Sequence, residues 1–79
     1  MPNANQLLCL SLAMFRYDIS RQIYDLNPST QNWFDMDDAV QGVLVAAFDC
    51  GIHGRFSRVY AESSALLASV VARYASRAA

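Results

Sequence analysis

Apolar residues recur at spacings of three and four along most of the chain, a pattern typical of α-helices rather than of strands. Two stretches interrupt the pattern, NPSTQN at residues 27–32 and GIHG at residues 51–54. An Asn-Pro pair ends helices because proline forces the residue before it out of the helical conformation. The sequence therefore predicts one all-α domain over residues 1–79, a compact three-helix bundle with short loops. The predicted helices cover about 5–26, 36–50 and 56–77.

The segment 5–26 carries apolar residues on two opposite sides. The first stripe consists of Leu8, Leu12, Phe15, Ile19, Ile23 and Leu26. The second consists of Leu10, Ala13, Tyr17 and Tyr24, with Arg21 among them. At about 100° per residue, the centres of the two stripes lie roughly 160° apart. A helix with a single core face needs only one stripe. We therefore expect this helix either to be packed on both sides or to offer its tyrosine side to a partner.

The segment 36–50 is apolar nearly all round and is predicted to be the central helix. Asp35 is the expected N-cap, and Asp37 and Asp38 then fall in the first turn, where carboxylates suit the positive end of the helix dipole. Its β-branched valines leave a buried strand as the alternative. The expected cap and the length of the segment favour the helix.

Two aromatic residues, Trp33 and Phe34, directly precede this predicted helix. Phe34 is expected to pack back onto the first turns as a hydrophobic staple. Trp33 then remains as either a core residue or an interaction anchor, because tryptophan is enriched among the residues that dominate binding energy. In the second case, Asp37 and Asp38 would form the polar rim.

The segment 56–77 is predicted to pack through one apolar face, and it also carries a separate line of alanines. The line consists of Ala61, Ala65, Ala68, Ala72 and Ala75, at alternating spacings of four and three. Alanine allows a neighbouring helix to approach closely, so Ala61, Ala65, Ala68 and Ala72 are candidates for self-association. The alternative is that alanine serves here only as a good helix former.

The stretch FDCGIHGRF, residues 48–56, brings Asp49, Cys50 and His53 together. A structural zinc site needs four ligands, and the remaining candidates, Cys9 among them, do not complete one within a single chain. A catalytic cysteine needs a base, an orienting group and a cleft. Helix termination accounts for every residue, with Gly51 in the left-handed position after the helix end. We expect no metal, no cofactor and no enzymatic activity.

Composition changes this picture in one respect. Hydrophobic residues make up 54% of the 79 residues, more than is usual, and a chain this short buries only about 60% of its unfolded surface. Some apolar surface is therefore expected to be covered by another chain. The net charge of −1 gives no overall basic field for nucleic acid. The run LLCLSLAMF has no preceding positive charge and is too short to span a membrane, so a cytoplasmic location without membrane contact is expected.

These observations favour a small non-catalytic protein that binds and covers a surface of a larger protein, as an adaptor, a regulator or an inhibitor. A phage-encoded inhibitor of a host defence complex, such as an anti-CRISPR, is one example of this class, and a homodimer is compatible with it. The candidate contact residues are Tyr17, Arg21, Tyr24, Trp33, Asp37 and Asp38. Three alternatives remain open: a DNA-binding regulator that uses the arginines of segment 56–77, a dimer linked by a zinc ion that two copies share, and a pure homo-oligomerisation module.

Overall fold

The chain forms three α-helices, and the computed structural model describes residues 1–78. They are α1 (Ala4–Leu26), α2 (Thr30–Asp49) and α3 (Phe56–Ala78). No strand occurs within these residues, so the all-α prediction is confirmed and the strand alternative for 36–50 is wrong. The first and third helices begin and end within one residue of their predicted bounds.

The start of α2 differs from the prediction, because this helix begins at Thr30 and not after Asp35. Ser29 is the N-cap, and its hydroxyl accepts a hydrogen bond from the Asn32 backbone N–H at 3.1 Å. The Asn32 side chain also donates to the Asn27 carbonyl at 2.8 Å, which closes the turn between α1 and α2. A serine is as good a cap as an aspartate, and starting here adds almost two turns of helix.

The start of α1 and the end of α2 have the capping motifs that their local sequence favours. Asn3 and Gln6 form a capping box at the start of α1. At the end of α2, the Ile52 N–H donates to the Ala47 carbonyl at 2.9 Å, and Gly51 has a φ of 81°. This is the Schellman motif, in which glycine occupies the left-handed position. The prediction that FDCGIHGRF is a helix end followed by a turn is confirmed.

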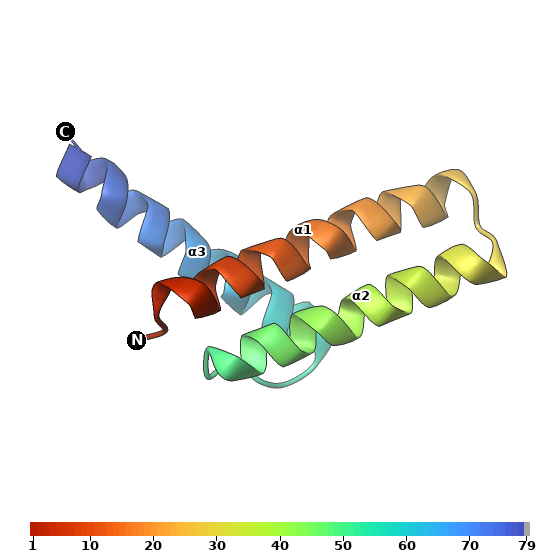
Figure 1. The fold of residues 1–79 in the computed structure, drawn as a ribbon, viewed down its shortest axis with the longest axis horizontal. Coiled ribbons are helices and arrows are strands. Elements are labelled where there is room, and N and C mark those ends of the chain that lie inside the picture. Colours follow the sequence, from red (N-terminus) through yellow and green to blue (C-terminus); the bar gives the residue numbers. More distant parts are fainter. Residues whose placement is uncertain (79) are drawn as a thin grey trace.

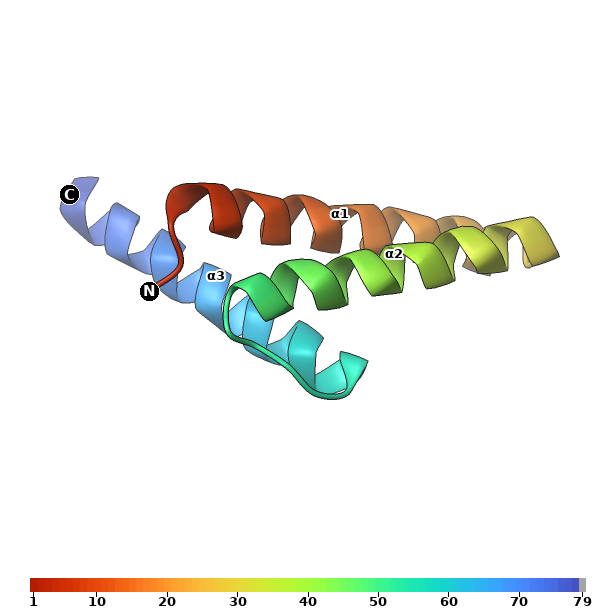
Figure 2. The ribbon, with the colours of Figure 1, turned by 60° about the horizontal axis from the view of Figure 1, so that its bottom comes forward.

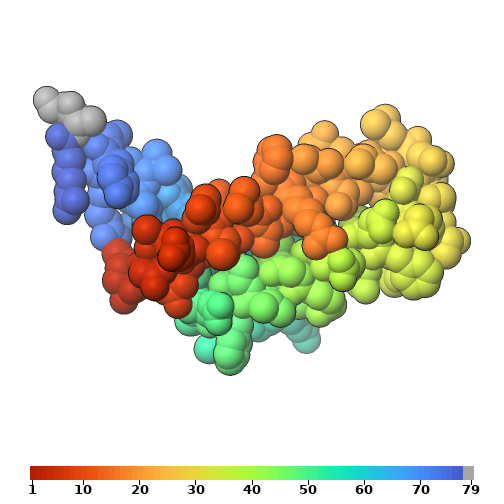
Figure 3. Space-filling model, viewed as in Figure 1, coloured from red at the N-terminus to blue at the C-terminus, as the bar shows by residue number. Residues whose placement is uncertain are grey.

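The helices α1 and α2 form an antiparallel hairpin, and α3 crosses one face of it near the open end (Figure 1). The second view shows α3 below the hairpin, with its C-terminal half extending past the start of α1 (Figure 2). The same half of α3 protrudes from the body of the molecule in the space-filling view (Figure 3). Packing between α1 and α2 is much more extensive than the packing of α3 on either.

The core lies where the three helices meet. Its buried residues are Leu10, Met14 and Tyr17 of α1, Ala39, Val43 and Ala47 of α2, and Val59 and Ser63 of α3. The small side chains of α2 allow α1 to approach closely. The molecule measures 45 × 25 × 20 Å with a radius of gyration of 13.9 Å, against about 11.6 Å for a compact chain of this length. The three-helix architecture is confirmed, but its shape is more extended than predicted.

Candidate functional site

The outer face of α1 carries a continuous exposed apolar surface, which we call the α1 outer stripe. It consists of Leu8, Leu12, Phe15, Ile19, Ile23 and Leu26. These side chains expose between 42% and 88% of their surface. The stripe extends for about 27 Å along the helix, since each residue adds about 1.5 Å.

The stripe is exposed because the opposite side of α1 already faces the core. Leu10, Met14 and Tyr17 are buried there, and Tyr24 is half-buried farther along the same side. The sequence correctly indicates two apolar sides separated by roughly 160°. The structure shows that the tyrosine side packs inward, with Tyr17 only 8% exposed, and that the leucine-rich side is exposed.

Aromatic packing against α3 accounts for the inward position of the tyrosine side of α1. The Tyr17 ring makes edge-on contacts with Phe56 and Tyr60 of α3, with ring centroids 4.8 and 5.7 Å apart. The Tyr60 hydroxyl also donates to an Asp18 carboxylate oxygen at 2.6 Å. This hydrogen bond, together with burial, raises the pKa of Tyr60 to about 12. These contacts attach α3 to α1, and no local pattern in the sequence indicates them.

Arg21 lies beside this aromatic group. Its guanidinium donates to the Tyr17 hydroxyl at 3.4 Å, and this contact raises the pKa of Arg21 above its ordinary value. Tyr17, Asp18, Arg21 and Tyr60 line a shallow pocket between α1 and the start of α3. Arg21 is exposed and therefore remains available as a polar contact at the edge of this pocket.

Two predicted contact residues come together at the closed end of the hairpin. Tyr24 of α1 and Trp33 of α2 line a shallow pocket with the turn residues between the two helices. Trp33 is 44% exposed and contacts Phe34 edge-on, at a centroid distance of 5.4 Å. Trp33 is therefore not a core residue. The expected staple by Phe34 is wrong, because both aromatics lie inside α2 and Phe34 is exposed.

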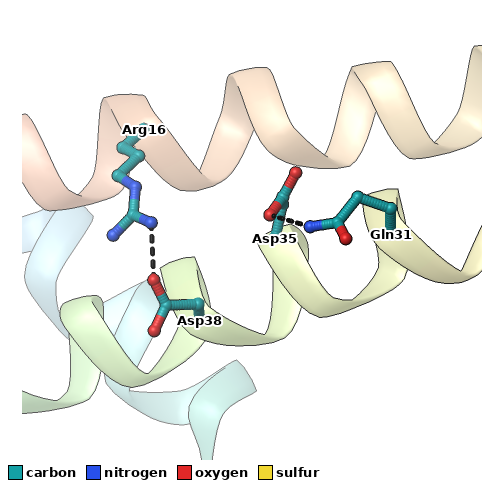
Figure 4. Close-up of polar contacts among 4 residues, drawn as sticks. All are labelled: Arg16, Gln31, Asp35 and Asp38. Atoms are coloured by element: carbon teal, nitrogen blue, oxygen red, sulfur yellow. Dashed lines mark hydrogen bonds and ion pairs between the residues drawn. The ribbon is translucent and has the colours of Figure 1, made fainter.

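The acidic residues Asp37 and Asp38 lie in the body of α2 and not in its first turn. They point to different sides, since consecutive helical residues are about 100° apart, and Asp37 is half-buried. Asp38 pairs with Arg16 of α1 at 2.7 Å across an open groove, while Asp35 accepts from Gln31 within α2 (Figure 4). An exposed ion pair of this kind contributes about 1 kcal/mol or less.

The other candidate surfaces are on α3 and at the end of α2. Ala61, Ala65, Ala68 and Ala72 are all exposed along one side of α3. On the polar side, Arg58 pairs with Glu62 at 2.9 Å, and Arg73 donates to Ser69 at 3.3 Å. Glu62 therefore offsets the charge of Arg58, whereas Arg73 donates to a neutral hydroxyl and keeps its full positive charge.

The Cys50 and His53 region is organised around the helix end. The Cys50 thiol is half-buried and donates to the Gln6 carbonyl at 3.7 Å, and burial raises its pKa. His53 is exposed and lies 5.3 Å from the Phe48 ring, centroid to centroid. In the part of the chain that the structure describes, no three histidine, cysteine or acidic side chains gather as metal ligands would.

Comparison of the chain with protein-family models, curated proteins and solved structures finds no match. Among residues 1–78, no helix combines the length and the apolar character that crossing a bilayer requires. Among the described residues, the α1 outer stripe is the longest row of large apolar side chains that are exposed on one helix.

Proposed function

We propose that this protein acts without catalysis, by binding another polypeptide through the α1 outer stripe. The proposal rests on one observation, six large apolar side chains exposed in a row on the outer face of a long helix. Monomeric proteins rarely expose a contiguous apolar patch larger than a few hundred Å², and larger patches mark interaction sites. Adaptors, regulators and inhibitors that cover a surface of a larger protein belong to this functional class.

The composition of the stripe supports binding to a protein. Phe15 lies near its middle, where an aromatic anchor is most effective because neighbouring contacts exclude water from it. Polar residues adjoin the stripe on both sides, including Arg16 and Asp18. An apolar centre with a polar rim is the usual anatomy of a protein–protein interface.

Among the contact residues indicated by the sequence, those at the closed end of the hairpin fit this proposal best. Tyr24 and Trp33 are partly accessible there, and Leu26, at the end of the stripe, is 88% exposed. Tyr24 lies on the core side of α1, so a partner on the stripe would reach Tyr24 and Trp33 only by extending around the closed end of the hairpin. Arg21 and Asp38 remain candidates for polar contacts, whereas the burial of Tyr17 assigns it a structural role.

Site-specific photo-crosslinking tests the proposal. Benzoylphenylalanine in place of Ile19 puts the reactive group within the stripe, and the same group in place of Gln41, which is exposed on α2, is the matched control. Irradiation in cells of the source organism should attach a second polypeptide at position 19 and little or none at position 41. Equal labelling at both positions, or none at position 19, would contradict the proposal.

A further inference from the structure

We infer that Cys9 of α1 and Cys50 at the end of α2 form a reversible disulfide that fastens the open end of the hairpin. Both thiols are free in this structure. The inference goes beyond the proposed function, because it holds whether or not the α1 outer stripe binds a partner. Three observations lead to it: the contact between Cys50 and α1, the position of Cys9 beside that contact, and the difference in exposure between the two thiols.

The first observation is that the end of α2 lies against the first turns of α1. The Cys50 thiol donates to the Gln6 carbonyl at 3.7 Å, and the Gln6 side chain donates to the Asp49 carbonyl at 3.1 Å. Cys50 is the C-cap of α2, so it follows the last helical turn and precedes the connection to α3. The Gln6 carbonyl therefore marks the point on α1 that the Cys50 sulfur contacts.

The second observation is that Cys9 is placed to reach the same carbonyl. It follows Gln6 by three residues on α1, and helical side chains lean toward the N-terminus of their helix, over the preceding turn. A short side chain in this position can reach the carbonyl oxygen three or four residues before it. Cys9 also lines one groove together with Asp49, the residue before Cys50. One carbonyl of α1 thus lies within reach of both sulfurs.

The electrostatics of Cys50 agree with this placement. Burial makes the largest contribution to the raised pKa of Cys50, and the negative charges of Asp49 and of an ionised Cys9 raise this pKa further. The effect of one charge on another falls with distance. A disulfide joins Cα atoms about 4.4–6.8 Å apart, and the turn 51–55 that follows Cys50 allows this end of α2 to adjust as the bond closes.

The third observation is that Cys9 is exposed and Cys50 is half-buried, which assigns the two thiols different roles. The Cys9 thiolate attacks a low-molecular-weight disulfide such as oxidised glutathione, so that a mixed disulfide forms and one glutathione thiolate leaves. The Cys50 thiolate then attacks the Cys9 sulfur and displaces the second glutathione. The two protein thiols are oxidised, their protons pass to solvent, and one glutathione disulfide is reduced to two thiols.

The bond would join the start of α1 to the end of α2 and enclose the whole connection between these helices. A crosslink stabilises a fold mainly by restricting the unfolded chain. The hairpin formed by α1 and α2 carries most of the helix packing in the molecule. Oxidation would therefore fasten the part of the fold on which α3 rests, and reduction would release it.

The test is equilibration of the purified full chain with mixtures of reduced and oxidised glutathione, followed by alkylation with N-ethylmaleimide. Intact-mass spectrometry should find an oxidised single chain that is lighter by two hydrogen atoms and takes up no alkylating agent. After trypsin, which cuts beside arginine, peptide 1–16 should be linked to peptide 22–55. The variants Cys9→Ser and Cys50→Ser should remain largely reduced at the glutathione ratio that crosslinks wild type, because each lacks the second thiol.

A matched control moves the first thiol along the same side of α1. Ala13 lines the same groove as Cys9 and lies about 6 Å farther along the helix. The double variant Cys9→Ser/Ala13→Cys should therefore form at least about tenfold less crosslink than wild type at the same glutathione ratio. Equal crosslinking in this variant would show that the position of Cys9 does not matter, and it would overturn the inference.

Stability gives a second measurement. The thermal midpoint of the oxidised chain should exceed that of the reduced chain by at least about 5 °C, with the same helical circular dichroism, and dithiothreitol should restore the lower value. The inference is overturned if wild type carries only glutathione adducts or disulfides between chains, or if both thiols are alkylated at every glutathione ratio. A crosslink that forms only with loss of helical structure would overturn it as well.

Discussion

Ser63 is fully buried between α3 and the α1–α2 hairpin, and its hydroxyl oxygen has no hydrogen-bond partner among the described residues. A buried hydroxyl that gives up its bonds to water without replacing them costs about 1–3 kcal/mol. The sequence indicates only that position 63 faces inward, because it falls on the apolar face of the third helix. That the hydroxyl remains unpaired depends on how closely α3 approaches the hairpin.

Ser63→Ala should therefore increase the free energy of unfolding by about 1 kcal/mol. Urea denaturation monitored by circular dichroism measures this change. Ser64→Ala is the matched control, because Ser64 is exposed on the same helix and reports the gain in helix propensity alone, about 0.5 kcal/mol. If Ser63→Ala gains no more than Ser64→Ala, the hydroxyl has a partner or is not buried in solution.

The hydrogen bond between Tyr60 and Asp18 makes stability depend on pH at the alkaline end. The pKa of Tyr60 is about 12 in the folded chain, against an ordinary value of 10. Between these two pH values the unfolded chain loses the phenolic proton while the folded chain retains it. The contribution of this hydrogen bond is therefore complete below pH 10 and declines as the pH rises from 10 to 12.

Tyr60→Phe should lower stability by about 1 kcal/mol at pH 8, since it removes one hydrogen bond to a carboxylate near the surface. It should also make the decline in unfolding free energy between pH 10 and 12 less steep than in wild type. Denaturation at several pH values measures both effects. Tyr74→Phe, at a tyrosine that is 70% exposed, should keep the wild-type slope, and a steep decline that persists in Tyr60→Phe would show that other groups cause it.

At the scale of the elements, the sequence predicts the ends of the helices more accurately than it predicts the start of α2. The segment NPSTQN contains both a helix stop and a helix start, and Asp35 is an equally acceptable cap by residue type. Ser29 is used because Asn32 bonds both to the Ser29 hydroxyl and to the Asn27 carbonyl. Extending α2 by these residues also lengthens its contact with α1.

Alanine should change the free energy of unfolding in opposite directions at Gly42, inside α2, and at Gly51, just after its C-terminal end. Gly51→Ala should lower the free energy of unfolding by about 1 kcal/mol, because a residue with a Cβ is strained in the left-handed conformation. The φ of Gly51 is 81°, and an added Cβ would gain no contact within 4 Å to offset the strain. Gly42→Ala should raise the free energy of unfolding by up to about 1 kcal/mol, because alanine favours the helical conformation more than glycine does. The added Cβ would fit without a clash, since its nearest neighbour is the end of the Arg16 side chain at 3.8 Å. Thermal unfolding of both variants tests this, and a loss at Gly42 would mean that α1 lies closer than the structure shows.

At the scale of the whole molecule, stability is unevenly distributed. The α1–α2 hairpin and the first half of α3 share the core, whereas the second half of α3 projects beyond them (Figure 1). Val71 and Tyr74 are 67% and 70% exposed. The apolar face predicted for this helix therefore extends past the surface on which it packs.

Amide hydrogen exchange should follow this division. Residues 71–77 should exchange at least about tenfold faster than residues 10–17 of α1, because helical segments with few buried contacts open with little free energy. Mass spectrometry of peptides after exchange measures the difference. Equal protection in both segments would indicate that the end of α3 is covered in solution.

The sequence by itself determined the number and the type of the elements, because 3.6-residue periodicity, proline and the Gly51 helix end are local properties. It also determined that α1 has two apolar sides. Only the tertiary structure decided which of the two faces the core. The outer stripe is the more hydrophobic of the two, and the tyrosine side nevertheless faces the core, where Tyr17 packs edge-on against Phe56 and Tyr60.

The candidate site follows from that choice and could not be read from the chain in advance. Tyr17 and Tyr60 are 43 positions apart, and Arg16 and Asp38 are 22 apart. Contacts at such separations depend on how the helices cross, which periodicity within one helix does not record. The sequence thus predicts that one chain has apolar surface to spare, and the tertiary structure places that surface on the outer face of α1.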